Sequence, residues 1–234
     1  MRKIIIPATA ILLLSILFSC RTKYGSGNIV TVQKSVPSFD AVSVSGGIET
    51  EISVGPQKIV VEADDNLVKF VKTEVVDGKL KISTGIKSLR DAHIKVFVTA
   101  PSIDELSASA GAEIKVNDVL ESPDKVHFTS SSAAEIESKV DAPNVEVDAS
   151  SGAKIKISGR TRNLAVESTS GAEVEAFGLM AETTEARSSS GGQAEVFASV
   201  TLSASASSGG EVKYRDGGKA SISQSSGGTV SRVN

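Results

Sequence analysis

The sequence has 234 residues, with 25 basic and 28 acidic side chains and a formal net charge of −3. Because the two signs are interspersed and form no basic stripe, the composition argues against a nucleic-acid partner. Aromatic residues make up only 4% and tryptophan is absent, which disfavours a wide aromatic core and favours a narrow core of small and branched side chains.

The first twenty residues have the form of an export signal. A short basic start precedes an apolar stretch over residues 4–18, which is too short to span a membrane comfortably. The run LFSC that ends at Cys20 resembles the lipobox of bacterial lipoproteins, in which the cysteine becomes the lipidated first residue. Cys20 is also the only cysteine, which suits lipidation better than disulfide or metal chemistry. We therefore predict a signal peptide over residues 1–19, a lipid anchor on Cys20 and a linker over residues 20–27.

Residues 28–105 are predicted to form an irregular β segment. Alternation of apolar and polar residues indicates six short strands. They cover residues 28–32, 41–44, 48–54, 59–62, 79–83 and 94–98. Asp77-Gly78 is a strong hairpin turn signal, and residues 66–72 fit either a short helix or another strand. The stretch from Val44 to Ile48 has the form of the later turns, so we expect the first coil to begin there.

Residues 106–234 carry a repeat of short Ser/Ala/Gly turns. Their centres are Gly111, Ala133, Gly152, Gly171, Gly191, Gly209 and Gly227, separated by 22, 19, 19, 20, 18 and 18 residues. A period near 19 is too short for helical repeats and fits one coil of a β-solenoid. The sequence therefore predicts an all-β fold, a parallel β-helix with coils of about 19 residues and little or no helix.

The residues around each turn alternate with period two. Apolar residues stand five before and three after each centre, where stacked coils would bury them as ladders. They are Leu106, Phe128, Val147, Val166, Ala186, Ala204 and Ile222, then Ile114, Ile136, Ile155, Val174, Ala194, Val212 and Val230. The columns between them are polar and predict solvated faces, in which Lys154 lies between Glu135 and Glu173.

One polar column carries a weak candidate for a binding site. Four residues before the turn centres, Asp148, Glu167 and Arg187 fall on consecutive coils. A carboxylate pair beside an arginine could bind or cleave an acidic sugar, although a solvated patch of ion pairs is the simpler interpretation. His93 and His127 have no second ligand at metal-binding spacing. We therefore predict no catalytic residue, no metal and no cofactor.

Several short motifs resemble the head GIN domain family. They are GSGN at 25–28, FDAVSVSGGI at 39–48, DNL at 65–67 and LKI at 80–82. The resemblance extends over residues 25–232 and includes the Ser-Gly-Ala coils. It implies a right-handed parallel β-helix on an envelope protein, of the kind described as auto-transporter adhesins of unknown function. It carries no catalytic residues to transfer.

Three functions are consistent with these observations. The first is a non-enzymatic lipoprotein of the cell envelope, anchored in the outer membrane, that presents a β-helix face to a glycan or protein as an adhesin or binding module. The second is a periplasmic structural or assembly lipoprotein, and the third is a polysaccharide-active β-helix enzyme. The side of the membrane stays open. Exposed solenoid ends predict either homo-oligomers formed through those ends or a cap on the last coil supplied by residues 25–45.

Overall fold

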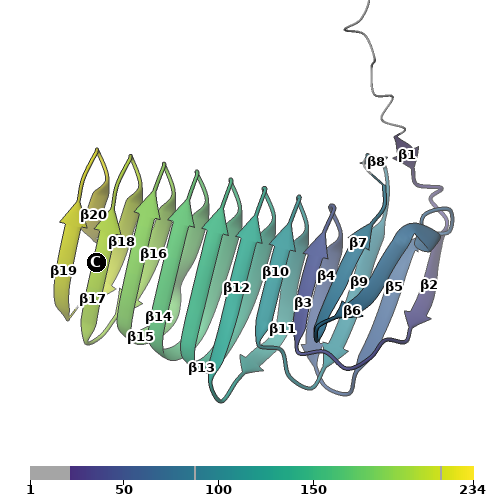
Figure 1. Ribbon diagram of the computed structural model, residues 1–234, viewed down its shortest axis with the longest axis horizontal. Coiled ribbons are helices and arrows are strands. Elements are labelled where there is room, and N and C mark those ends of the chain that lie inside the picture. Colours follow the sequence, from purple (N-terminus) through teal and green to yellow (C-terminus); the bar gives the residue numbers. More distant parts are fainter. Residues whose placement is uncertain (1–21, 87, 217) are drawn as a thin grey trace, which may run out of the picture.

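The computed structural model describes residues 22–86, 88–216 and 218–234, which form a β-solenoid (Figure 1). Helix is limited, in this part of the chain, to one 3-10 turn, η2 (Val68–Phe70). The strands are β1 (Lys23–Tyr24), β2 (Ile29–Lys34), β3 (Ala41–Ser45), β4 (Glu49–Val54), β5 (Lys58–Asp64), β6 (Val71–Val76), β7 (Lys79–Thr84), β8 (Leu89–Arg90), β9 (Ile94–Ala100), β10 (Glu105–Ser109), β11 (Glu113–Glu121), β12 (Lys125–Ser131), β13 (Glu135–Ser150), β14 (Lys154–Thr169), β15 (Glu173–Ser189), β16 (Gln193–Ala198), β17 (Thr201–Ala206), β18 (Glu211–Asp216), β19 (Lys219–Gln224) and β20 (Thr229–Arg232). The all-β prediction is confirmed.

Each coil contributes one strand to each of two sheets. The first sheet holds the strands before the tight turns, in the order β6-β7-β3-β10-β12, then the second halves of β13, β14 and β15, then β17 and β19. The second sheet holds the strands after the turns, in the order β2-β5-β9-β4-β11, then the first halves of β13, β14 and β15, then β16, β18 and β20. From the β7–β3 and β9–β4 pairs onward the neighbours run parallel, which confirms a parallel β-helix.

The tight turns at one edge of the coils need left-handed backbone at both central residues. At one of them, Ser151 and Gly152 have φ of 56° and 70°. The Ala153 N–H donates to the Ser150 carbonyl across the turn at 3.2 Å, as in the type I′ turns of hairpins. The Gly152 N–H donates to the Ser170 carbonyl of the next turn at 3.1 Å. The repeated Ser-Gly pairs therefore both close each coil and join it to its neighbour.

The predicted apolar ladders form one continuous core between the sheets. Leu106, Phe128, Ile136 and Ile155 are fully buried, at 0% exposed. Each such side chain contributes roughly 1.5–3 kcal/mol before conformational entropy is subtracted. In the last coil the ladder prediction is confirmed at Val230, which is buried, and is wrong at Ile222, which is 44% exposed. There no further strand packs over β19 within the described part of the chain.

The six strands predicted for residues 28–105 correspond to β2, β3, β4, β5, β7 and β9. The turn between β3 and β4 falls at Gly46 and Gly47, whose φ values are 87° and 68°. β3 and β4 pair in parallel with β10 and β11, so the first coil begins where the sequence predicts it.

The N-terminal end of the solenoid is covered by antiparallel strands. β6 and β7 form a hairpin about the predicted Asp77-Gly78 turn, and β5 lies between β2 and β9. η2 follows β5 and precedes β6, and Leu67 at its start is 1% exposed. Residues 66–72 thus contain both a helical turn and the first part of a strand. The segment 25–45 lies at this end because β2 pairs with β5 and β3 with β7, so it does not cap the last coil as expected (Figure 1). End-to-end association stays a prediction.

Among the residues that the structure describes, no helix could span a membrane. The predicted signal peptide over residues 1–19 and the predicted lipidation site, Cys20, lie outside the described residues.

Candidate binding groove

The three candidates from the sequence share the outer face of the first sheet. Asp148 is in register with Glu167, and Glu167 with Arg187, so they do stack on neighbouring strands. They border a shallow recess of about 160 Å³, which is also lined by the small side chain of Ala165. The structure therefore brings the three residues together on one surface.

Two of these three side chains contact other residues rather than each other. Asp148 Oδ2 lies 2.8 Å from His127 Nε2, and Arg187 pairs with Glu185 of its own strand rather than with Glu167. The contact with Asp148 raises the pKa of His127 above its ordinary value, against burial, which lowers it. In the described part of the chain, no cluster of three or more His, Cys, Asp or Glu is arranged to hold a metal ion. The geometry supports a patch of exposed ion pairs.

A groove crosses the second sheet between two longer coils. The coils that begin at Gly111 and Gly171 have 22 and 20 residues, and part of the excess forms bulges. In β11, residues 116–118 stand opposite a single residue of β13, and in β15, residues 176–177 stand opposite a single residue of β14. The β13–β14 pair between the bulges keeps its register. The two bulges are therefore three inter-strand steps apart, about 14 Å, and the groove continues one strand further to Glu195 of β16.

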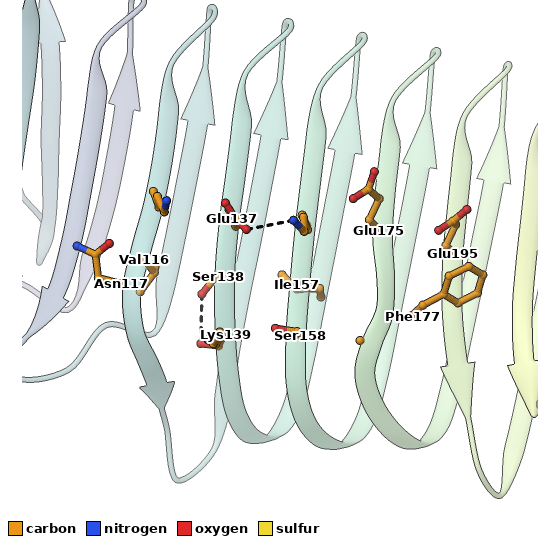
Figure 2. A pocket seen from close by; sticks show the side chains of 13 residues that line it. Val116, Asn117, Glu137, Ser138, Lys139, Ile157, Ser158, Glu175, Phe177 and Glu195 are labelled. Carbon is orange, nitrogen blue, oxygen red and sulfur yellow. Dashed lines mark hydrogen bonds and ion pairs between the residues drawn. The ribbon is translucent and has the colours of Figure 1, made fainter.

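The groove has a volume of about 430 Å³ and a mixed lining. Asn117 and Phe177 lie toward its two ends, with Ser138, Ile157 and Ser158 between them (Figure 2). Ser138 and Ile157 are buried in the sheet, whereas Phe177 is partly exposed. An apolar ring, hydroxyl groups and one side-chain amide thus line a single trough.

A row of charges of both signs runs along the groove and ends in two acidic residues, Glu175 and Glu195. Lys115, Glu137, Lys156 and Glu175 occupy the same column of four neighbouring strands. Lys156 Nζ lies 3.2 Å from Glu137 Oε1, and both side chains are about half exposed. Glu175 instead pairs with Lys154 of the adjacent column at 2.5 Å, and this hydrogen bond raises the pKa of Lys154. Exposed pairs of this kind contribute under about 1 kcal/mol each, so a ligand can compete for these charges.

The aromatic end of the groove is held by a cation–π contact. Arg215 Cζ lies 4.3 Å from the centroid of the Phe177 ring, which restrains the ring where the bulge of β15 places it. The arrangement can bind a polar, extended ligand that has an apolar face. Sequence reasoning missed this groove, and the signal that could have found it is the excess length of the coils that begin at Gly111 and Gly171.

Motifs from distant parts of the sequence meet at the N-terminal end and have a structural role. Asp64, which is 1% exposed, accepts hydrogen bonds from the Gly27 and His93 N–H groups, each at 2.7 Å. Asp65 accepts a hydrogen bond from the Asn28 side chain at 2.9 Å. The GSGN motif is thereby tied to the end of β5. These residues stabilise the fold and lie apart from the groove.

The fold is a β-solenoid with one covered end and a groove on its second sheet. A family model described as "Putative auto-transporter adhesin, head GIN domain" matches residues 38–218. The chain therefore belongs to the head GIN domain family, as the motifs predicted. This is a family of adhesin type, which indicates an extracellular or cell-envelope protein.

Solved structures with the same fold include proteins of Bacteroides and Parabacteroides. A "putative adhesin" from Bacteroides fragilis NCTC 9343 has a TM-score of 0.83 at 19% identity, covering 90% of this chain and 100% of its own. One from Parabacteroides merdae ATCC 43184 has a TM-score of 0.73 at 19% identity, covering 91% and 99%. A "putative lipid binding protein" from Parabacteroides distasonis ATCC 8503 has a TM-score of 0.70 at 18% identity, covering 92% and 100%. At these identities the likeness shows the fold alone. No match was found among proteins with curated descriptions.

Proposed function

We propose that the protein is a non-enzymatic, lipid-anchored binding module of the bacterial outer membrane that acts as an adhesin and holds a glycan chain in the groove of the second sheet. The observation that carries the proposal is the groove itself, with Phe177 toward one end and charges of both signs along it. Because the strands that line the groove are hydrogen-bonded to their neighbours, the groove is formed before the ligand arrives. Binding then avoids the cost of ordering a loop.

An envelope location is supported by the family and by the first residues of the sequence. The family is of adhesin type. The basic start, the short apolar stretch and the sole cysteine, Cys20, fit a lipoprotein signal. Acyl chains on Cys20 would hold the module at the membrane.

A glycan fits the chemistry of the lining. The hydroxyl group of Ser158 and the charges of Glu137 and Lys156 can exchange hydrogen bonds with sugar hydroxyls. The ring of Phe177 offers an apolar surface for the face of a sugar ring. Because the groove carries charges of both signs, it disfavours the binding of a polyanion. The open trough suits an extended chain better than a compact molecule.

The first experiment locates the protein in the cell. Intact cells are treated with protease, and the protein and a periplasmic marker are then detected. We expect the protein to be cleaved while the marker survives. If the protein is protected in intact cells but cleaved after lysis, the surface adhesin is wrong, and a periplasmic assembly role takes its place.

The second experiment tests the groove with a glycan array. We expect Phe177→Ala and Glu137→Gln each to weaken binding of any glycan that the native protein retains, by about tenfold for Phe177→Ala. Glu167→Gln on the first sheet is the matched control for Glu137→Gln and should bind normally. If Glu167→Gln loses binding and both groove variants keep it, the site lies on the first sheet. Release of sugar products that Asp148→Ala abolishes would show an enzyme instead.

A further inference from the structure

The last coil presents two open strand edges. β19 pairs with β17 and β20 pairs with β18, and within the described part of the chain no strand pairs with the outer side of either. In β19 the Lys219 and Ser225 N–H groups donate to carbonyls of the preceding coil, at 2.9 and 3.0 Å. Because successive residues of a strand direct their backbone groups to opposite sides, Ala220, Ile222 and Gln224 turn their N–H and C=O groups to the open side.

The same alternation holds in β20. The Thr229 and Val233 N–H groups donate to the preceding coil, each at 2.9 Å, so Val230 and Arg232 turn their backbone groups outward. Strand edges are usually blunted by charges, prolines or bulges, because a bare edge is a template for another strand. Here β19 pairs without a bulge, and the charged residues of the two strands are Lys219 and Arg232. The last coil is therefore suited to binding two further strands.

A second copy of the same end fits the edge of the first sheet. A two-fold axis perpendicular to the sheets sets the β19 strands of the two copies side by side and antiparallel. With the axis at Ile222, the two Ile222 residues exchange backbone hydrogen bonds, and Ala220 of each copy exchanges them with Gln224 of the other. The Ile222 side chain belongs to the inner ladder and is 44% exposed, so this pairing buries it against its counterpart.

The same axis also fits the second sheet. The turn between β19 and β20 is closed by the Gly228 N–H, which donates to the Ser225 carbonyl at 2.8 Å. Ile222 lies three residues before this turn and Ser231 three residues after it, so one axis passes both. Centred on Ser231, the β20 strands bring their outward backbone groups opposite each other. The basic residues then face uncharged ones of the other copy, Ser225 and Val230, so no like charges are opposed.

We propose that the last coil binds a second copy of this chain, tail to tail, by antiparallel pairing of β19 with β19 and of β20 with β20. The two-fold axis closes the contact at a dimer, whereas head-to-tail contacts would extend into filaments. Two pairs of short strands form a small interface. We expect a dissociation constant of about 0.1 mM, so that dilute protein is monomeric and its last coil is exposed.

On a membrane, the contact would join two anchored molecules. β19 and β20 lie at the opposite end of the stack from β1 and β2 (Figure 1). A lipid on Cys20 would therefore leave the last coil outermost, where it meets molecules on a facing surface. Many copies on each surface compensate for a weak individual contact. This consequence rests on the proposed lipid anchor, whereas the contact itself does not.

The first test is disulfide cross-linking of the full-length protein in mild detergent. Opposite residues of a hydrogen-bonded antiparallel pair have Cα atoms about 5.5 Å apart, which a disulfide can bridge. Ile222→Cys should therefore give a covalent dimer on oxidation. Ser221→Cys should not, because its own counterpart lies on the diagonal, about 7–8 Å away. A mixture of Ser221→Cys and Ser223→Cys should again give the dimer, because these positions are opposite each other.

The native protein is the control for cross-linking, because Cys20 is its only cysteine. If Ile222→Cys gives no more dimer than the native protein, the contact is overturned. Equal yields from Ile222→Cys and Ser221→Cys would show random collision and would overturn it as well.

The second test is sedimentation velocity over a range of concentrations. Ile222→Lys sets two like charges opposite each other and should weaken the dimer at least about tenfold. Ser221→Lys, which points to solvent and faces a serine, should dimerise normally. Species larger than a dimer that grow with concentration would show head-to-tail contacts instead. Glycan binding should be unchanged in both variants, so a failure of the groove proposal would leave this test intact. An unchanged melting temperature checks that each variant is folded.

Discussion

The two ends of the solenoid are built differently. At the N-terminal end, β2, β5 and β6 run antiparallel to their neighbours, and Leu67, just before η2, is 1% exposed. At the other end, all six residues of β19 are exposed and Ile222 is 44% exposed. A repeated coil buries its apolar face only against another coil, so a covered end needs sequence that departs from the repeat. The irregular segment 28–105 departs from the repeat and covers the N-terminal end.

The largest effect should come from removing apolar contacts at the covered end. We expect Leu67→Ala to lower the free energy of unfolding by about 2–5 kcal/mol, because it leaves a cavity in a fully buried site. Its matched control, Ile222→Ala at the exposed end, should cost under about 1 kcal/mol, since that side chain is already half in water. Urea unfolding followed by circular dichroism measures both. Equal losses would show that the last coil is covered in solution, as end-to-end association predicts.

The next effect comes from the polar contacts that hold the first residues to the covered end. Asp64→Ala leaves the Gly27 and His93 N–H groups without their partner, and we expect a loss of about 1–3 kcal/mol. Hydrogen exchange at Gly27 should become fast. Asp65→Ala, which removes an exposed acceptor of the same motif, should have a smaller effect. If Asp64→Ala left exchange at Gly27 slow, the carboxylate would not be what holds this segment.

The rates of amide hydrogen exchange should also differ between the covered N-terminal end and the exposed C-terminal end. We expect the amides of β19 and β20 to exchange by local opening, faster than those of β5 and β9, because exposed strands open at lower free energy than buried ones. Mass spectrometry of peptic fragments gives the order. Uniform protection along the stack would contradict the exposed end.

The smallest expected effect is a pH-dependent change in stability at His127, which lies in a column whose residue types differ between the two ends of the stack. His127 of β12 is followed in its column by Glu146, Ala165 and Glu185, and at the exposed end by Ser203 and Ser221. The contact with Asp148 raises the folded-state pKa of His127 above the ordinary value of 6.5. Its stabilisation is therefore fully present below about pH 6.5 and is lost as the pH rises through the raised pKa.

We therefore expect His127→Gln to be less stable than the native protein at about pH 5.5 and nearly equal to it at about pH 8.5. The difference should stay under about 1 kcal/mol, because the Asp148 side chain is 51% exposed. Ser203→Gln, in the same column, should show no such pH dependence. Unfolding by urea at the two pH values measures both variants. A His127→Gln protein that is destabilised equally at both values would show a packing role without titration.

Much of the coil could be predicted because its period and alternation follow directly from strand geometry. Lys154 lies in register between Glu135 and Glu173, as the spacing of the turns predicted. The groove could not be predicted in the same way. Coil lengths show that two coils contain extra residues, but not that the excess forms bulges at 116–118 and 176–177 on the same sheet. The position of each bulge depends on the residue at which its strand returns to register with the neighbouring strand.

The sequence by itself determined the stack, the tight turns and, apart from Ile222, the apolar ladders inside the core, because each of these depends on local backbone preference and on a period of two. Only the tertiary structure decided which charges meet and which end is covered. Arg187 binds Glu185 rather than Glu167, and Lys154 reaches Glu175 on the diagonal at 2.5 Å, because long side chains choose among several neighbours at similar distance. The covered end likewise depends on antiparallel pairs between segments far apart in sequence, which no repeat specifies.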